Sequence, residues 1–90
     1  MTLERWKTFK KREQLLFIGS EFERARVWQE EGDAEKFRGA LERAVTLINL
    51  SLQDKRWVSD IEQLRVLRRE AQKFQTGENQ KAVSILYQVL

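Results

Sequence analysis

Apolar residues recur every three or four positions along almost the whole chain, and they do not alternate with polar residues as they would in strands. The sequence contains no proline, so the strongest helix breaker is absent. Glycines with helix-starting residues beside them separate the apolar stretches. This pattern predicts an all-α fold, an up-and-down bundle of four or five antiparallel helices joined by short loops.

The first 31 residues carry two apolar stripes that point in different directions. Thr2 is a suitable N-cap for the helix that begins here. The early stripe consists of Leu3, Trp6 and Phe9, and the later one consists of Leu15, Ile18, Phe22 and Ala25. At about 100° per residue, the later stripe is turned by more than about 90° from the early one. One straight helix cannot bury both stripes against one surface.

Two interpretations of this change of direction remain open. The chain either breaks near Gly19, where Ser20 and Glu23 have the spacing of a capping box, or forms one helix of about 30 residues with different neighbours at its two ends. We favour the single helix, because one internal glycine costs a helix only about 1 kcal/mol.

The clearest helix boundary lies at Gly32 and Asp33, where a C-terminal glycine is followed directly by an N-cap residue. The helix predicted after it covers AEKFRGALERAVTLINLSLQ. Its apolar stripe consists of Phe37, Leu41, Ala44, Ile48 and Leu52. A single stripe of this width predicts the best-formed core helix of the bundle.

Two further helices are predicted on either side of Gly77, which ends the first of them. This first one begins either at Asp54 or at Ser59, whose SDIE sequence has capping-box spacing. Its stripe consists of Ile61, Leu64, Leu67, Ala71 and Phe74. The last helix is predicted from Asn79, and apolar residues cover more than half of its circumference, namely Ala82, Val83, Ile85, Leu86, Val89 and Leu90. A helix of this kind must be covered on two sides.

The stretches that begin at Gly32 and Gly77, GDAEKFRGALERAV and GENQKAVSILYQVL, echo each other. Both are predicted as the second half of a helical hairpin. Their turns, and the spacing of small and bulky residues after them, resemble the tetratricopeptide repeat. The positions concerned are Phe37, Leu41 and Ala44 in one helix, and Ala82, Leu86 and Val89 in the other. The resemblance covers these second helices only, and the alternative is two ordinary antiparallel helix pairs.

Composition excludes several kinds of chemistry. The chain has no cysteine and no histidine, which removes disulfides, thiolate nucleophiles, imidazole bases and nearly all transition-metal sites. Carboxylates remain, but the cluster of Glu30, Glu31 and Asp33 is best explained as hydrated acids at a turn. We therefore expect no enzyme activity, no metal and no cofactor.

The 90 residues are expected to form a single domain. The longest apolar run, Leu15 to Ile18, is far shorter than the roughly 20 residues that span a bilayer. The N-terminus lacks the apolar core of a signal peptide. We therefore expect a soluble, cytoplasmic protein without a transmembrane segment.

The net charge of +3 is concentrated near the N-terminus. The cations there, with the aromatic residues among them, are Arg5, Trp6, Lys7, Phe9, Lys10, Lys11 and Arg12. Cations interleaved with aromatics can bind a phosphate backbone and stack on bases. The alternative, which we favour, is a solvated helix face whose aromatics dock on the bundle.

The sequence therefore favours a small helical module that binds a protein partner or itself. A homodimer is expected, because two copies would cover the apolar last helix and part of the first one. The predicted interface consists of Phe22, Ile85, Leu86, Val89 and Leu90. The alternative function is a basic, nucleic-acid-associated helical protein that uses the N-terminal cations.

Overall fold

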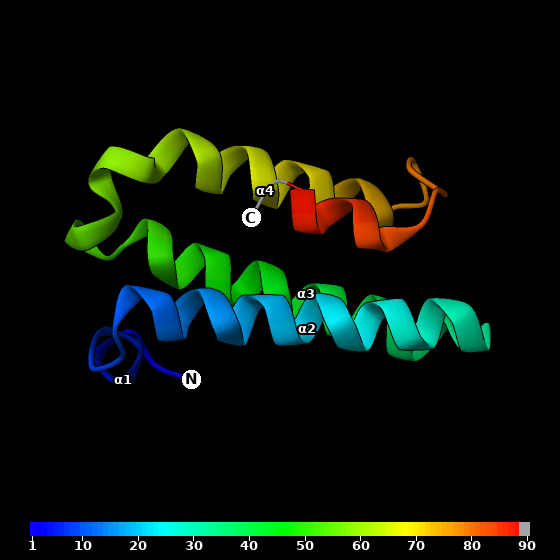
Figure 1. The fold of residues 1–90 in the computed structure, drawn as a ribbon, viewed down its shortest axis with the longest axis horizontal. Helices are drawn as coiled ribbons and strands as arrows, with labels where there is room; N and C mark the ends of the chain where they lie inside the picture. The colour runs from blue at the N-terminus through cyan, green and yellow to red at the C-terminus, as the bar shows by residue number, and fades with distance from the viewer. Residues whose placement is uncertain (89–90) are drawn as a thin grey trace.

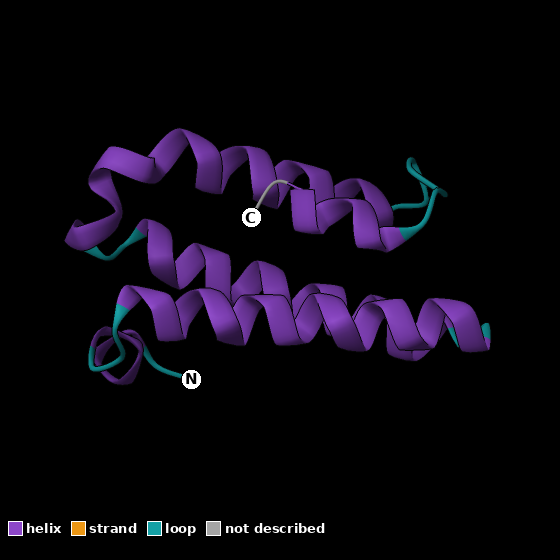
Figure 2. Cartoon of the chain, in the orientation of Figure 1, coloured by secondary structure: helices purple, strands orange, loops and turns teal. Residues whose placement is uncertain are grey.

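The computed structural model describes residues 1–88, and 82% of the chain is helical with no strand in the part described. The elements are α1 (Leu3–Lys7), α2 (Lys11–Glu31), α3 (Ala34–Leu52), the 3₁₀ helix η1 (Lys55–Asp60), α4 (Ile61–Gln75) and the 3₁₀ helix η2 (Val83–Gln88). The predicted all-α bundle is confirmed. Loops are short and lie mostly at the ends of the bundle (Figure 2).

The long helices α2 and α3 form an antiparallel hairpin around the predicted boundary (Figure 1). Gly32 ends α2 in the left-handed conformation, with φ of 76°, which glycine adopts without steric cost. Asp33 caps α3, and its side chain accepts a hydrogen bond from the backbone N–H of Lys36 at 3.0 Å. The predicted helix end at Gly32 and the predicted N-cap at Asp33 are therefore both confirmed.

Helix α4 packs on α3, and η2 returns along the bundle to cover α2 and α4 (Figure 1). Helical structure begins after Asp54, which caps η1 by accepting the N–H of Arg56, whereas the α-helix itself starts at Ile61. Both predicted starting points were thus partly right, but Ser59 does not cap α4. Gly77, with φ of 79°, follows the end of α4 as predicted.

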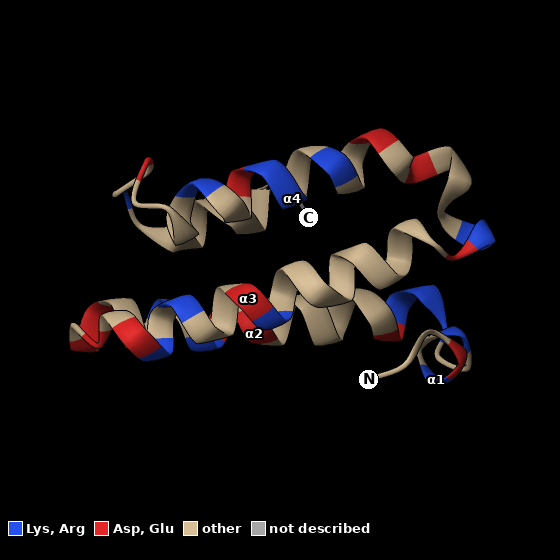
Figure 3. Cartoon of the chain, turned by 180° about the vertical axis from the view of Figure 1, so that it is seen from behind, with Lys and Arg blue, Asp and Glu red and all other residues tan. Residues whose placement is uncertain are grey.

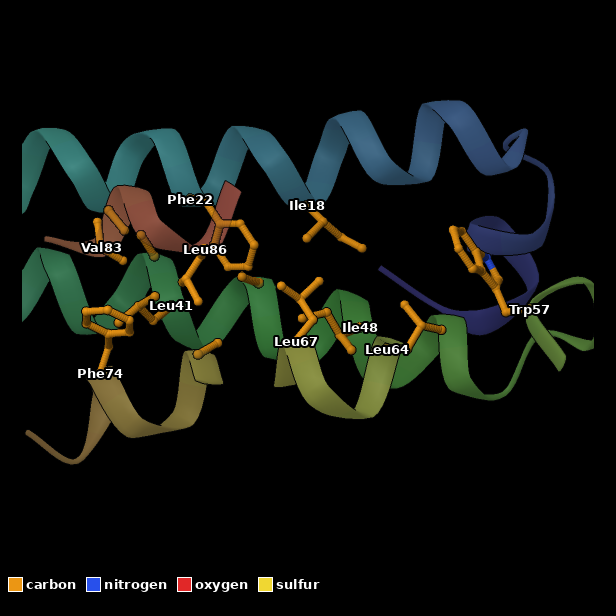
Figure 4. Close-up of a cluster of buried hydrophobic side chains, with 14 of the residues drawn as sticks. Ile18, Phe22, Leu41, Ile48, Trp57, Leu64, Leu67, Phe74, Val83 and Leu86 are labelled. Atoms are coloured by element: carbon orange, nitrogen blue, oxygen red, sulfur yellow. The ribbon is translucent and has the colours of Figure 1, made fainter. Parts of the chain in front are cut away.

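The core is one continuous cluster formed by all the helices (Figure 4). Leu86 of η2 points toward Phe22 of α2 and Leu41 of α3, while Ile48 of α3 and Leu67 of α4 face each other (Figure 4). The predicted stripes of α3 and α4 supply seven of the fifteen buried hydrophobic residues within residues 1–88, since each helix turns a single apolar face to the others.

Both interpretations of the first 31 residues were wrong. The chain breaks at Thr8 to Lys10, and Gly19 lies within the continuous helix α2. Lys10 is extended, and its N–H donates to the Glu13 carboxylate at 2.8 Å, so a capping interaction starts α2 there. Ser20 starts no helix, because its hydroxyl donates to the carbonyl of Leu16. The two stripes point in different directions because they belong to two helices.

The last segment also differs from its prediction. The Asn79 side chain accepts the N–H of Lys81 at 2.9 Å, as a turn residue does, but the helix that follows is a short 3₁₀ helix beginning at Val83. Ala82 therefore precedes this helix and is exposed, while Leu86 lies within it. Val89, the third position of the tetratricopeptide-like spacing, lies outside the described residues.

A buried polar network holds α1 across the end of the bundle. The Trp6 indole N–H donates to Ser51 of α3 at 3.0 Å. The Gln14 amide donates to the Trp6 carbonyl at 2.8 Å and accepts the indole N–H of Trp57 at 2.5 Å. Asp54 joins the network through Gln14 and Arg56, and the hydrogen bonds from Arg56 hold the pKa of Asp54 far below its usual range.

Candidate functional site

The outward side of α2 carries the most unusual surface of the molecule. Leu16 is 65% exposed and Val27 is 38% exposed, although both belong to a helix whose other side supplies Ile18 and Ala25 to the core. Eleven residues separate Leu16 from Val27, which is about 20° in direction and about 16 Å along the helix axis. These two side chains therefore point the same way, opposite to the core.

Two polar residues, Ser20 and Glu23, lie between them on the same line. Positions 16, 20, 23 and 27 follow the alternating spacing of four, three and four that brings a narrow line of side chains against another helix. We call Leu16, Ser20, Glu23 and Val27 the outer seam. Its spacing could have been found in the sequence, but the stripe that supplies the core ran through the same segment and was the stronger signal.

A shallow, open hollow of about 400 Å³ adjoins the seam. Gly19 has no side chain and Ser20 has a small one, so both leave room beside the protruding Leu16. The hollow is lined by Arg12, Leu15, Leu16, Gly19, Ser20, Glu23 and Tyr87. A bulky side chain from a partner could enter it next to Leu16.

Tyr87 of η2 forms one wall of this hollow and fixes Glu23. Its hydroxyl donates to the Glu23 carboxylate at 2.5 Å, and Arg26 donates to the same carboxylate through Nε at 3.1 Å. The bonds from Arg26 and then Tyr87 lower the pKa of Glu23 to about 2. Burial and the bond to Glu23 raise the pKa of Tyr87 to about 12. Glu23 is therefore a fixed negative charge in the middle of the seam.

Charge along α2 is strongly polarised, with blue at its start and red at its far end (Figure 3). Residues 10–13 contain three cations, Lys10, Lys11 and Arg12, against the single acid Glu13. Residues 30–33 contain three acids and no cation. Lys11 is used internally, since it pairs with Asp60 at 2.9 Å and lies over the Trp57 ring.

The predicted nucleic-acid residues all lie at the end of the bundle where α1 meets α2 (Figure 3). Trp6 is 0% exposed, so it cannot stack on a base, and its assignment to that role was wrong. Phe9 is half-buried and packs against the rings of Trp6 and Phe17, with centroids 6.2 and 4.9 Å away. The solvent-exposed members of the set are the cations Arg5, Lys7, Lys10 and Arg12.

The predicted interface residues do not form one exposed surface. Phe22 and Leu86, each 1% exposed, belong to the core of the single chain, because η2 covers α2 at this point. Their assignment to an interface was therefore wrong. Ile85 is 42% exposed and stays available. Val89 and Leu90 lie outside the described residues.

Other features of residues 1–88 are weaker candidates for a functional site. The buried carboxylate of Glu21 is bound by Arg24 and Arg43, the latter at 2.6 Å, and a second open hollow lies beside it. Among the residues that the structure describes, no group of three or more acidic residues is arranged to hold a metal ion. No helix in this part of the chain has the length and apolar character needed to cross a membrane.

Neither protein-family models, nor curated proteins, nor solved structures gave a match to this chain.

Proposed function

We propose that this chain is a small, non-catalytic protein–protein interaction module, and that its binding surface is the outer seam of α2. The partner is an amphipathic helix that lies along the seam. The single observation that carries the proposal is that α2 has apolar side chains on two opposite sides, Ile18 and Phe22 inward and Leu16 and Val27 outward.

Exposed apolar residues on their own need no explanation in a soluble protein. Leu16 and Val27 are different because they share one direction on one helix and are joined by a line of seam spacing. A helix that is apolar on two sides is covered on two sides. Within residues 1–88, the fold reaches the outer seam through Tyr87 at Glu23 and leaves Leu16 and Val27 exposed to another molecule.

The shape of the surface favours a helix as partner. With 21 residues, α2 is about 31 Å long, and its outward side is continuous because Gly19 does not interrupt it. Leu16 projects from α2, and the hollow at Gly19 and Ser20 lies beside it. Packed helices need such an alternation of projecting side chains and hollows, because each knob of one helix enters a hole of the other. The polarised charge of α2 selects a partner whose cations and acids run in the opposite spatial order.

The proposal is tested with a designed amphipathic peptide of 21 residues as the probe. The peptide has leucine at seam spacing, cations in its first turn and acids in its last turn. We expect it to bind antiparallel to α2 and to shift the amide NMR signals of Leu16, Ser20 and Val27. Leu16→Asp should abolish the shifts, whereas Val58→Asp, at an exposed apolar residue on η1, should keep them. Absence of shifts on α2 at millimolar peptide would refute the proposal.

The alternative function, nucleic-acid binding by the N-terminal cations, keeps four exposed cations but loses Trp6 as a stacking platform. A salt titration against single-stranded and duplex nucleic acid separates the two functions. Binding through phosphates weakens steeply with salt, with a slope set by the number of phosphates neutralised. We expect at most weak binding that disappears by physiological salt. Tight binding that survives there would favour the alternative.

A further inference from the structure

We propose that the partner of the outer seam is a second copy of this chain, bound so that the two α2 helices run antiparallel about a two-fold axis between Glu21 and Phe22. This inference rests on the proposed function, because it names the occupant of the same surface. Two-fold pairing presents one surface patch to itself, so every contact occurs twice.

The apolar residues of the seam match themselves in this arrangement. With the axis at that point, Leu16 lies opposite the partner's Val27, and Val27 lies opposite the partner's Leu16. At the centre, the small polar Ser20 lies opposite the partner's Glu23, so this charge faces a polar side chain, while the Ser20 hydroxyl donates to the Leu16 carbonyl of its own helix. No apolar residue of the seam faces a charge.

The polarised charge of α2 selects the antiparallel orientation. The basic residues 10–13 of one copy come to lie against the acidic residues 30–33 of the other, and a parallel pair would place like charges together. Arg12 and Glu30 are separated by 18 residues, five full helical turns, and point in the same direction. Arg12 therefore meets the partner's Glu30 at both ends of the seam.

A second observation points the same way. Cations normally stabilise the last turn of a helix and acids the first turn, because of the helix dipole. In α2 this order is partly reversed, because Lys11 and Arg12 lie in the first turn beside Glu13, and Glu30 and Glu31 lie in the last, where Arg26 pairs with Glu30 at 2.8 Å. Within one chain Lys11 pairs with Asp60 and Glu30 pairs with Arg26, so these helix ends are neutralised in part, and the opposite end of a second α2 would complete the neutralisation.

The contacts of the seam set the expected affinity. On the edge of the seam away from Arg12 and Glu30, Glu13 lies near the partner's Glu31. The repulsion between these two acids offsets part of the attraction between Arg12 and Glu30. One pair of helices also buries less area than a standard interface. We therefore expect a reversible dimer with a dissociation constant on the order of 10 µM.

The oligomeric state is measured by sedimentation equilibrium of the full chain. We expect Leu16→Asp to weaken dimerisation by at least about 100-fold, because it places charges opposite both Val27 side chains. Val58→Asp is the matched control and should leave the dimer intact. Circular dichroism checks that both variants are folded. A wild-type chain that stays monomeric at 1 mM, on the order of 100 times the expected dissociation constant, would overturn the inference.

A charge exchange tests the orientation. We expect Arg12→Glu and Glu30→Arg each to weaken self-association, because each puts like charges at both ends of the seam. A one-to-one mixture of the two variants should form heterodimers as tight as the wild type, since both ionic contacts are then restored. Within one chain the two positions are about 27 Å apart and cannot compensate each other. A mixture as weak as the single variants would contradict the orientation.

Disulfide trapping tests the register in a chain that has no cysteine of its own. A mixture of Leu16→Cys and Val27→Cys chains should form a cross-linked heterodimer on oxidation. Neither variant alone should cross-link, because its two cysteines would lie about 16 Å apart along the helices. Cross-linking of Leu16→Cys with itself would contradict the register.

These outcomes are separable from failure of the proposed function. If the chain is monomeric but the designed helix still shifts the signals of Leu16 and Val27, the seam is an interaction surface for another protein and self-pairing is wrong. If neither the second copy nor the designed helix binds, both proposals fail.

Discussion

At the scale of single residues, Gln14 is the most constrained polar side chain in the molecule. It is completely buried, and one amide group serves three partners, the carbonyl of Trp6, the indole of Trp57 and the carboxylate of Asp54. Glutamine is suited to this position because its amide both donates and accepts without carrying a charge. Every buried side-chain nitrogen and oxygen in the described residues has a hydrogen-bond partner.

We expect Gln14→Leu to destabilise the fold by about 2–3 kcal/mol, because it leaves the Trp57 indole buried without a partner and removes one of the two hydrogen bonds to the Trp6 carbonyl, which still accepts the Phe9 N–H. Equilibrium unfolding in urea, followed by circular dichroism, measures the change. The control is Gln63→Leu on the exposed side of α4, which should change stability by less than about 0.5 kcal/mol. Equal stability of the two variants would show that the network contributes little.

At the scale of elements, the three long helices differ in how they use their sides. Helices α3 and α4 each bury one stripe, whereas α2 is apolar inward at Ile18 and outward at Leu16. The glycines make a second contrast, because Gly39 lies in the interior of α3 with ordinary helical geometry, while Gly32 ends α2 at positive φ.

We expect Gly39→Ala to stabilise the protein by about 0.5–1 kcal/mol, because alanine lowers the entropy of the unfolded chain. The added Cβ would lie 3.5 Å from the Arg43 guanidinium, an ordinary contact. Gly32→Ala should destabilise by about 1 kcal/mol, since its left-handed φ of 76° strains any side chain although space is free. Thermal melts of both variants give the two signs, and a stabilising Gly32→Ala would contradict the role of this turn.

Helix α3 and its cap were predictable because Gly32, Asp33 and one clean stripe all point to the same structure. The break before α2 was not, since Lys10 is no typical cap residue and what folds α1 over is the long-range bond between Trp6 and Ser51. For the same reason the sequence could not show that Phe22, predicted at an interface, is covered by η2 of the same chain, whereas Leu16 stays exposed. Spacing gives the direction of a side chain, but tertiary packing decides what lies there.

At the scale of the whole molecule, α1 is the closing element of the core. It lies across the end of the bundle beside the start of α2 (Figure 1), and it contributes Trp6, which is fully buried. Arg56 of η1 also donates to the Lys7 carbonyl at 3.2 Å, so two segments far apart in sequence hold α1 in place. The cations of α1, and those that follow it in the chain, therefore lie on or beside a helix that completes the core.

Removal of residues 1–10 tests this role. It deletes a buried tryptophan, a loss of about 3–5 kcal/mol in the scale of Trp→Ala changes. It also removes the Trp6 partner of Gln14 and of Ser51, at about 1 kcal/mol for each lost hydrogen bond, although Gln14 keeps Trp57 and Asp54 and Ser51 keeps the Leu47 carbonyl. Together these losses approach the whole stability of a small domain, about 5–15 kcal/mol. We therefore expect the truncated chain to lose its cooperative thermal transition, as measured by circular dichroism and by the combined fluorescence of Trp28 and Trp57. Trp6→Phe, which keeps most of the apolar volume, should remain folded with a lower melting temperature. A truncated chain that melts like the full one would make α1 an appendage, and its cations would then be free for a nucleic-acid partner.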